Sequence, residues 1–199
     1  MGEQTEADAR TEEIRSLYQD IQAKQKRLAE LLRSGPEEVV EDWVFDGPKG
    51  KVKLSELFGD QDDLILVHNM GRSCPYCTLW ADGFNGVWPH LASRAAFVVI
   101  SPDDPETQAE FALSRKWAFP MASDAVGDFT KAMGYLGEHQ GQAMRLPGFS
   151  TFKRKASGEI VRIANAPFGP GDPYAGIWHL FALLDGGAGE WGPKFEYDG

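Results

Sequence analysis

Cysteine is scarce in this sequence, which has only two among 199 residues, at positions 74 and 77. Two cysteines this close together cannot form the framework of several disulfides that stabilises small secreted domains. In a reducing compartment, a Cys-x-x-Cys pair instead indicates redox chemistry or two of the four ligands of a metal site.

Long apolar runs and an excess of positive charge are also missing. No stretch approaches the ~20 consecutive apolar residues of a membrane span, and residues 1–10, MGEQTEADAR, lack the basic and apolar segments of a secretory signal. With 30 acidic against 20 basic residues, the net charge of -10 repels nucleic-acid phosphates and anionic membrane surfaces. We therefore expect a cytoplasmic protein that has neither nucleic acid nor membrane as a partner.

The composition indicates one folded domain with an extension. Apolar residues make up 42% of the chain, including 12 Phe and 6 Trp, which is enough to build a sizeable core. We predict a helical extension over residues 1–40 and a single domain over residues 41–199. Between residues 11 and 33 the apolar positions fall largely on one helical face, interrupted by the polar run 24–27, and Gly35-Pro36 ends this helix. This face packs either on its own domain or on a second copy of the chain, which would give a homodimer.

The middle of the domain alternates strand and helix patterns. Residues 64–67 and 97–100 are continuous apolar runs, as in parallel strands that are covered on both faces. Between them, residues 75–92 carry apolar side chains at helical spacing, which predicts a strand, a crossover helix and a parallel strand. The two cysteines then lie at the carboxyl end of the first strand.

The remaining patterns complete an α/β fold in which helices flank a central mixed sheet. They predict a hairpin over 43–54 with a helical turn from Ser55, helices over 105–116 and 126–133, a strand over 117–122, a loop over 137–143, an edge hairpin of 149–152 and 160–163, and a last helix that begins at Asp172-Pro173.

The motif Cys74-Pro75-Tyr76-Cys77 has the spacing that dithiol chemistry needs. The thiolate is the nucleophile in disulfide exchange, so the attacking cysteine needs groups that favour its ionised form. With Pro75 as the first helical residue, the free amides of the helix N-terminus favour a Cys74 thiolate, and Arg72 can add a positive charge. One helical turn separates the cysteines, so Cys77 can reach back to a mixed disulfide. We predict that Cys74 attacks and Cys77 resolves.

The same residues carry a resemblance to known families. The segment 64–77, LILVHNMGRSCPYC, is similar to the strand and active site of thioredoxins, and Cys-Pro-Tyr-Cys is the glutaredoxin tetrapeptide. Residues 97–135 resemble the inserted unit of peroxiredoxins. As a whole, residues 50–197 resemble the bacterial domain of unknown function 899 family, with GRSCPYCTLWADGFNG at 71–86 as the signature. The resemblance implies a thioredoxin-like fold with a peroxiredoxin-type insert, and redox use of the cysteines.

Three positions depart from these relatives. Thioredoxins place a buried acid six residues before the first cysteine, and His68 stands there. It either accepts the proton of the resolving thiol or is a hydrogen-bonded histidine at a strand end. Peroxiredoxins place Pro and Thr where this chain has Val67 and Gly71, which disfavours a direct peroxidase activity.

The resemblance also implies which residues meet the substrate. Thioredoxin-like proteins have a cis-proline opposite the cysteines, and Pro147 is the candidate here, with an ordinary trans proline as the alternative. Tyr76, Trp80 and Pro147 are then expected at the substrate. The turn 168–172 is similar to the glycine-rich turn with which glutaredoxins bind the glutathione carboxylate, and a capped loop is the alternative.

The sequence therefore predicts a thiol–disulfide oxidoreductase that needs no cofactor. Its partner would be a disulfide-containing protein or a low-molecular-weight thiol such as glutathione. Two alternatives stay open. One is a metal or iron–sulfur binder in which His68 or a second subunit completes the ligands of Cys74 and Cys77. The other is a non-enzymatic interaction module that uses the N-terminal helix.

Overall fold

A computed structural model of the chain describes residues 2–139 and 141–197. The chain divides between Pro36 and Glu37 into two compact units. The sequence patterns place this division after residue 40. In the structure it falls earlier, because residues 38–40 form a strand of the second unit.

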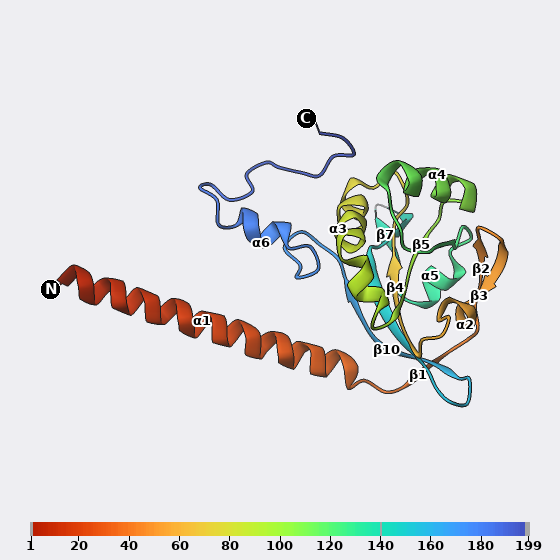
Figure 1. Ribbon diagram of the computed structural model, residues 1–199, viewed down its shortest axis with the longest axis horizontal. Coiled ribbons are helices and arrows are strands. Elements are labelled where there is room, and N and C mark those ends of the chain that lie inside the picture. Colours follow the sequence, from red (N-terminus) through yellow and green to blue (C-terminus); the bar gives the residue numbers. More distant parts are fainter. Residues whose placement is uncertain (1, 140, 198–199) are drawn as a thin grey trace. The chain divides into compact units, whose positions relative to one another are not determined.

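The first unit consists of one long helix, α1 (Gly2–Arg33), shown in red and orange in Figure 1. Its apolar residues follow a seven-residue repeat. Ile14, Ile21 and Leu28 occupy one position of the repeat, and Leu17 and Leu31 occupy a second, in which Lys24 lies between them. Repeats of this kind form the seam between helices of a coiled coil. Helix α1 therefore carries an apolar face with coiled-coil spacing, and a partner helix for this face stays a proposal.

The second unit is built on one eight-stranded sheet with the order β1-β10-β9-β4-β5-β6-β2-β3. The strands β4, β5 and β6 are parallel to one another, and all other neighbours are antiparallel. The sheet is therefore mixed, as predicted. Its strands are β1 (Glu38–Val40), β2 (Val44–Gly47), β3 (Gly50–Lys53), β4 (Asp63–His68), β5 (Ala96–Ser101), β6 (Met121–Ser123), β9 (Gly148–Arg154) and β10 (Ile160–Pro167).

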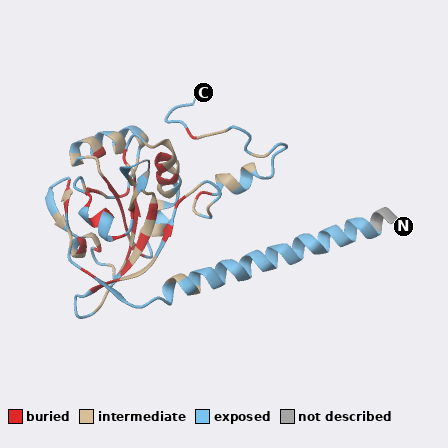
Figure 2. Ribbon diagram, turned by 180° about the vertical axis from the view of Figure 1, so that it is seen from behind, coloured by how far each residue is buried: buried red, intermediate tan, exposed pale blue. Residues whose placement is uncertain are grey.

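Helices cover both faces of this sheet, and buried residues concentrate between the layers (Figure 2). Helix α3 packs against one face, while α2 and α5 contribute to the core on the other. The helices are α2 (Leu54–Leu57), α3 (Pro75–Ala92), α4 (Pro105–Arg115), α5 (Asp128–Ala132) and α6 (Ile177–Phe181). The bounds of α3 agree with the sequence prediction because Pro75 marks its start. In the described part of the chain, no helix has the length and apolar character to cross a membrane.

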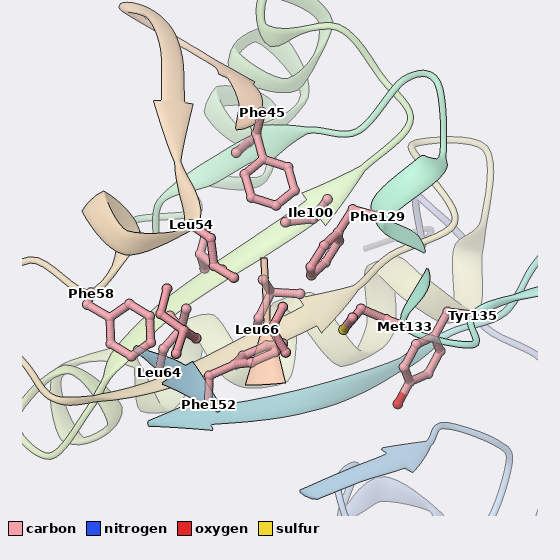
Figure 3. Close-up of a cluster of buried hydrophobic side chains, with 14 residues drawn as sticks. Phe45, Leu54, Phe58, Leu64, Leu66, Ile100, Phe129, Met133, Tyr135 and Phe152 are labelled. Atoms are coloured by element: carbon pink, nitrogen blue, oxygen red, sulfur yellow. The ribbon is translucent and has the colours of Figure 1, made fainter. Parts of the chain in front are cut away.

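Strand β4 separates two apolar clusters because successive side chains of a strand point to opposite faces. Leu64 and Leu66 belong to the cluster with Phe129, drawn in Figure 3. Val67 belongs to the other cluster, together with Trp80 of α3. The alternation decides which cluster each side chain near the cysteines joins, and it places His68 with Leu64 and Leu66.

Several elements begin at other places than the sequence patterns predict. Strand β6 starts at Met121 rather than at residue 117, and helix α5 starts at Asp128 rather than at residue 126. Helix α2 starts at Leu54 rather than at Ser55, because the amide and hydroxyl of Ser55 both donate hydrogen bonds to the Asp42 carboxylate. Helix α6 starts at Ile177, after Gly176, instead of at Asp172-Pro173. The Asp172 carboxylate accepts hydrogen bonds from nearby amides and shapes a turn there, so the chain becomes helical only afterwards.

The segment 137–143, which the sequence predicts as a loop, contains parts of two strands. Its ends belong to a separate two-stranded sheet of β7 (Leu136–His139) and β8 (Gln142–Arg145). The polar segment lacks the apolar alternation by which a strand is recognised, so the pattern did not reveal it.

Candidate redox site

The two cysteines lie where β4 gives way to α3. Cys74 is the N-cap of α3 and Pro75 follows inside its first turn. Proline suits this position because its ring fixes a helical φ and it lacks an amide hydrogen that would have no partner there. Cys77 lies one turn later, on the buried side of the helix, whereas Cys74 is half-buried. The site therefore presents one accessible thiol and one protected thiol.

The environment of Cys74 favours its thiolate. The thiol of Cys77 donates a hydrogen bond to it, and the backbone amides of Cys77 and Tyr76 also favour the charge. The amide of Cys77 lies 3.2 Å from the Cys74 Sγ. Against the opposing effect of partial burial, these groups lower the pKa of Cys74 from 9.0 to about 6. Cys74 is therefore largely ionised near neutral pH.

The environment of Cys77 has the opposite effect. Its hydrogen bond to Cys74 favours the protonated form, and burial and the neighbouring negative charge add to this, so its pKa is raised. The backbone amide of Met70 donates to the Cys77 Sγ at 3.4 Å. Cys77 therefore keeps its proton while Cys74 carries the charge. This division suits the predicted order of attack and resolution, although the order itself stays a prediction.

A carboxylate from the next loop holds the segment before Cys74. The Asp103 Oδ2 accepts hydrogen bonds from the Arg72 amide at 2.9 Å and from the Ser101 hydroxyl at 3.0 Å. Gly71 adopts a φ of 103°, and an added Cβ would lie 3.1 Å from the Asp103 carboxylate. Only glycine tolerates both conditions readily. Asp103 is thus a positioning residue for the loop that carries Cys74.

The sequence patterns did not reveal Asp103, which resembles an ordinary charged turn residue. One signal was available. Asp103 follows β5, whose carboxyl end lies beside that of β4 because the two strands are parallel and adjacent. Arg72, by contrast, was singled out for its charge. Its side chain is exposed, and it is not among the groups that lower the pKa of Cys74.

His68 does not lie with the cysteines. Its ring stacks on Tyr135 with centroids 3.8 Å apart, on the sheet face opposite α3, and its Nε2 lies 3.0 Å from the Ser150 hydroxyl. Burial, with smaller effects from Arg162 and Arg145, lowers the pKa of His68 to about 3. The geometry is that of the second interpretation, a neutral, hydrogen-bonded histidine at a strand end.

Three other expected residues do meet beside Cys74. Tyr76, Trp80 and Pro147 line a cavity of about 270 Å³ that also contacts Cys74 itself. The rest of the lining comes from Met70 and from residues 168–170. The peptide bond before Pro147 is trans, as are the others that the structure describes, so Pro147 is the ordinary trans proline of the alternative and not a cis-proline. Pro147 lies directly before β9 and lines the cavity beside Cys74.

The turn at residues 168–172 is a capped loop. The Asp172 carboxylate accepts hydrogen bonds from the amides of Gly169 at 2.9 Å, Tyr174 at 2.7 Å and Ala175 at 3.1 Å. These amides are the donors that a bound carboxylate would need. The protein supplies that carboxylate itself, which is the alternative that the sequence left open.

The C-terminal segment packs against the motif through aromatic side chains. Tyr76 stacks on Trp178 of α6 with centroids 6.2 Å apart, and Trp178 meets Trp191 at 5.6 Å. The sequence patterns assigned Trp178 only to a helix. The last helix thereby contacts Tyr76, the third residue of the redox motif, and limits how far this side chain can move.

No cluster of three or more His, Cys, Asp or Glu side chains suited to a metal ion occurs within residues 2–139 and 141–197. The metal-binding alternative stays a prediction that requires ligands from a second chain.

Comparison with solved structures identifies the class of fold. A peroxidoxin BcpB from Mycobacterium tuberculosis has a TM-score of 0.54 and 26% identity, over 66% of this chain and 84% of that one. Bacterioferritin comigratory protein from Xanthomonas campestris follows with 0.52 and 20%, over 68% and 85%. Reduced Prx3 from Vibrio vulnificus has 0.55 and 15%, over 69% and 89%. The chain has the thioredoxin fold of the peroxiredoxins.

The family is identified by the sequence itself. Residues 4–194 match the family described as "Bacterial protein of unknown function (DUF899)", and the chain belongs to it, which confirms the resemblance. No curated protein matches the chain.

Proposed function

We propose that this protein is a thiol oxidoreductase that exchanges two electrons between its Cys74/Cys77 dithiol and a disulfide. The observation that supports this most directly is the division of roles between the two thiols. Cys74 is accessible and favoured as a thiolate, while Cys77 is buried, protonated and in hydrogen-bond contact with it. A nucleophile beside a protected second thiol is the arrangement that a dithiol reductase needs.

The reaction follows in two balanced steps. The Cys74 thiolate attacks one sulfur of the substrate disulfide, forms a mixed disulfide and releases the other sulfur as a thiolate. Cys77 then loses its proton to solvent or to the leaving thiolate and attacks the Cys74 sulfur. The second substrate thiolate leaves, and the protein is oxidised by two electrons to the Cys74–Cys77 disulfide. An external dithiol restores the reduced form.

The other expected site residues have different proposed roles. Tyr76, Trp80 and Pro147 form the wall against which the substrate lies. Arg72 contributes a positive charge that solvent and salt screen. His68 supports the end of β4 from across the sheet. We propose a reducing compartment such as the cytoplasm, where the thiols stay available, and a disulfide-containing protein or a low-molecular-weight thiol as partner.

Peroxide reduction is a second candidate, favoured by the fold shared with a peroxidoxin. Here the Cys74 thiolate would attack the O–O bond, giving a sulfenic acid and water or an alcohol. Cys77 would then displace water to form the disulfide. Val67 and Gly71 replace the residues that peroxiredoxins use before the reactive cysteine, so disulfide exchange is the first candidate.

The deciding experiment gives the reduced protein a peptide disulfide, glutathione disulfide, hydrogen peroxide or an organic hydroperoxide in separate reactions. We expect stoichiometric reduction of a disulfide, loss of this reaction in Cys74→Ser, and a trapped mixed disulfide in Cys77→Ser by mass spectrometry. A Cys74→Ser protein that still reduces disulfides would overturn the proposal. Fast reaction with hydroperoxides alone would favour the second candidate.

A further inference from the structure

The cavity beside Cys74 has a chemical character that bears on the substrate. Its aromatic walls are Tyr76, Trp80 and Phe168, and Met70 adds a flexible apolar side chain. Trp80 and Phe168 stack with centroids 5.1 Å apart, so one wall is a continuous aromatic surface. Among the described residues that line the cavity, only Cys74 carries a charge in its favoured state. An apolar group would gain free energy by leaving water there.

The size of the cavity suits a side chain rather than a whole molecule. About 270 Å³ is below the range of ~300–1,000 Å³ that is common for pockets enclosing drug-sized ligands. A single phenyl or branched aliphatic group fits this space while the rest of the ligand stays outside. Because Cys74 lines the same cavity, the group must be attached close to the sulfur that Cys74 attacks.

Anionic groups meet unfavourable surroundings here. The amides of Gly169, Tyr174 and Ala175 are already bonded to Asp172, so they are not free for a carboxylate of a ligand. The Asp172 charge itself repels one, and the net charge of -10 adds a weaker repulsion at longer range. Glutathione disulfide, which bears several carboxylates and no large apolar group, fits this site poorly.

From these contacts we infer that the preferred substrate is a peptide or protein disulfide with an apolar or aromatic side chain next to the cysteine. That side chain occupies the cavity between Tyr76, Trp80 and Phe168 while Cys74 attacks the adjacent sulfur. The inference rests on the proposed function and names its substrate class. The exchange is the two-electron reaction described above, with the peptide disulfide as the oxidant.

The test measures single-turnover rate constants of the fully reduced protein, so that no partner reductase is needed. The probes are three oxidised tetrapeptide disulfides that differ only in having Phe, Gln or Glu before the cysteine, together with glutathione disulfide. Each rate is divided by the rate with dithiothreitol, which removes differences in the intrinsic reactivity of the disulfides. The Phe to Gln ratio reports apolar contact, and the Gln to Glu ratio reports charge.

We expect the Phe peptide to react about tenfold faster than the Gln peptide. This ratio corresponds to the free energy of burying part of one apolar side chain. The Glu peptide and glutathione disulfide should be slower again. Met70→Gln should reduce the Phe to Gln ratio because it places an amide in the cavity wall. Pro170→Lys, at the exposed rim, should reduce the Gln to Glu ratio. Val126→Lys adds the same charge at a position that is 85% exposed and outside the cavity, and it should leave both ratios unchanged.

Alkylation of Cys74 by iodoacetamide, measured in parallel, distinguishes a failure of the inferred substrate preference from a failure of the proposed oxidoreductase function. Equal normalised rates for Phe, Gln and Glu peptides, with normal alkylation, would overturn the inference and leave the oxidoreductase intact. A reactive Cys74 that reduces none of the disulfides would overturn the proposed function instead. A variant whose alkylation rate or thermal unfolding differs from the parent shows a disturbed fold, and the peptide ratios of the parent protein then decide.

Discussion

The backbone amide of Cys77 donates a hydrogen bond of 3.2 Å to the Sγ of Cys74. The Cys77 thiol lowers the pKa of Cys74 and the Cys74 sulfur raises the pKa of Cys77, so the two thiols titrate as a pair. The favoured state has the charge on the accessible sulfur and the proton on the buried one.

The first prediction concerns the pH dependence of Cys74. Because the pKa of Cys74 is lowered to about 6, the thiolate fraction rises through that pH and is nearly complete at pH 7. The rate of alkylation by iodoacetamide should therefore rise with a midpoint near pH 6 and level off above pH 7. A midpoint near 9.0, the ordinary value, would show that the hydrogen bonds do not act as described.

Two variants check the cause of this shift. Cys77→Ala removes the thiol hydrogen bond, the largest contribution, and should move the midpoint of Cys74 upward. The midpoint should move towards the ordinary value of 9.0, because burial then opposes only the amides of residues 76 and 77. Cys74→Ser leaves only Cys77, which is buried. Burial still raises its pKa after the interactions with the Cys74 thiolate are lost, and this protein should react slowly with iodoacetamide. An unchanged midpoint in Cys77→Ala would contradict the assigned cause.

The second prediction assigns His68 to stability. His68→Phe keeps a ring against Tyr135 but loses the contact with Ser150, which should cost about 1–3 kcal/mol at pH 7. The alkylation midpoint of Cys74 should not change, because His68 lies across the sheet from Cys74. Urea denaturation and the alkylation profile are the two measurements. A shifted pH profile of Cys74 alkylation in a stably folded His68→Phe protein would support a role for His68 in proton transfer.

The pH dependence of unfolding tests the same residue. The pKa of His68 is about 3 in the folded state, below its ordinary value of 6.5, so the unfolded chain binds the extra proton between these values. The stabilisation from neutral His68 is complete above pH 6.5 and is lost progressively as the pH falls towards 3. Between pH 7 and pH 5 the parent should lose about 2 kcal/mol that His68→Phe does not lose. Equal losses would contradict the burial of a neutral ring.

Local patterns predicted the centre of the fold because strong signals coincide there. The apolar run of β4, the proline that starts α3 and the second apolar run of β5 each mark one element, and their order restricts the connection to a crossover. The position of the cysteines follows from this order. The same reasoning could not give the sheet face of His68, because a strand's periodicity does not say which face α3 covers.

Other parts of the site depend on contacts between distant segments, which no local pattern contains. Asp103 holds the Arg72 amide from 31 positions further along the chain. Trp178 reaches Tyr76 only because the C-terminal segment returns to α3. Helix α6 starts later in the structure than the sequence predicts for a related reason. Asp172 has the residue type of a helix N-cap but uses its oxygens to close a turn.

The third prediction concerns Gly148, beside the cavity residue Pro147. A Cβ on Gly148 would lie 2.5 Å from the Ala166 carbonyl oxygen and would also collide with the Tyr135 ring. Gly148→Ala should therefore destabilise the protein by about 1–3 kcal/mol, the range for overpacking a core. Gly83→Ala in α3 is the matched control, since nothing lies within 4 Å of its added Cβ. It should unfold at the same or a slightly higher temperature, because alanine favours helix more than glycine. Equal melting temperatures for Gly148→Ala and the parent would show that Gly148 packs less closely against Ala166 and Tyr135 than described.

The last prediction concerns the homodimer through α1, which stays a proposal. Ile14, Leu17 and Ile21 lie on the seven-residue repeat, and the corresponding face of a second copy would bury them in a coiled-coil seam. Leu17→Glu should place a charge in that seam and shift the protein to the monomer in sedimentation equilibrium. Gln19→Glu adds the same charge on another side of α1 and should leave the mass unchanged. Because the redox site lies within the second unit, the disulfide exchange rate of Leu17→Glu should equal that of the parent. A parent that sediments as a monomer at all concentrations would refute dimerisation and leave the helix face for another partner.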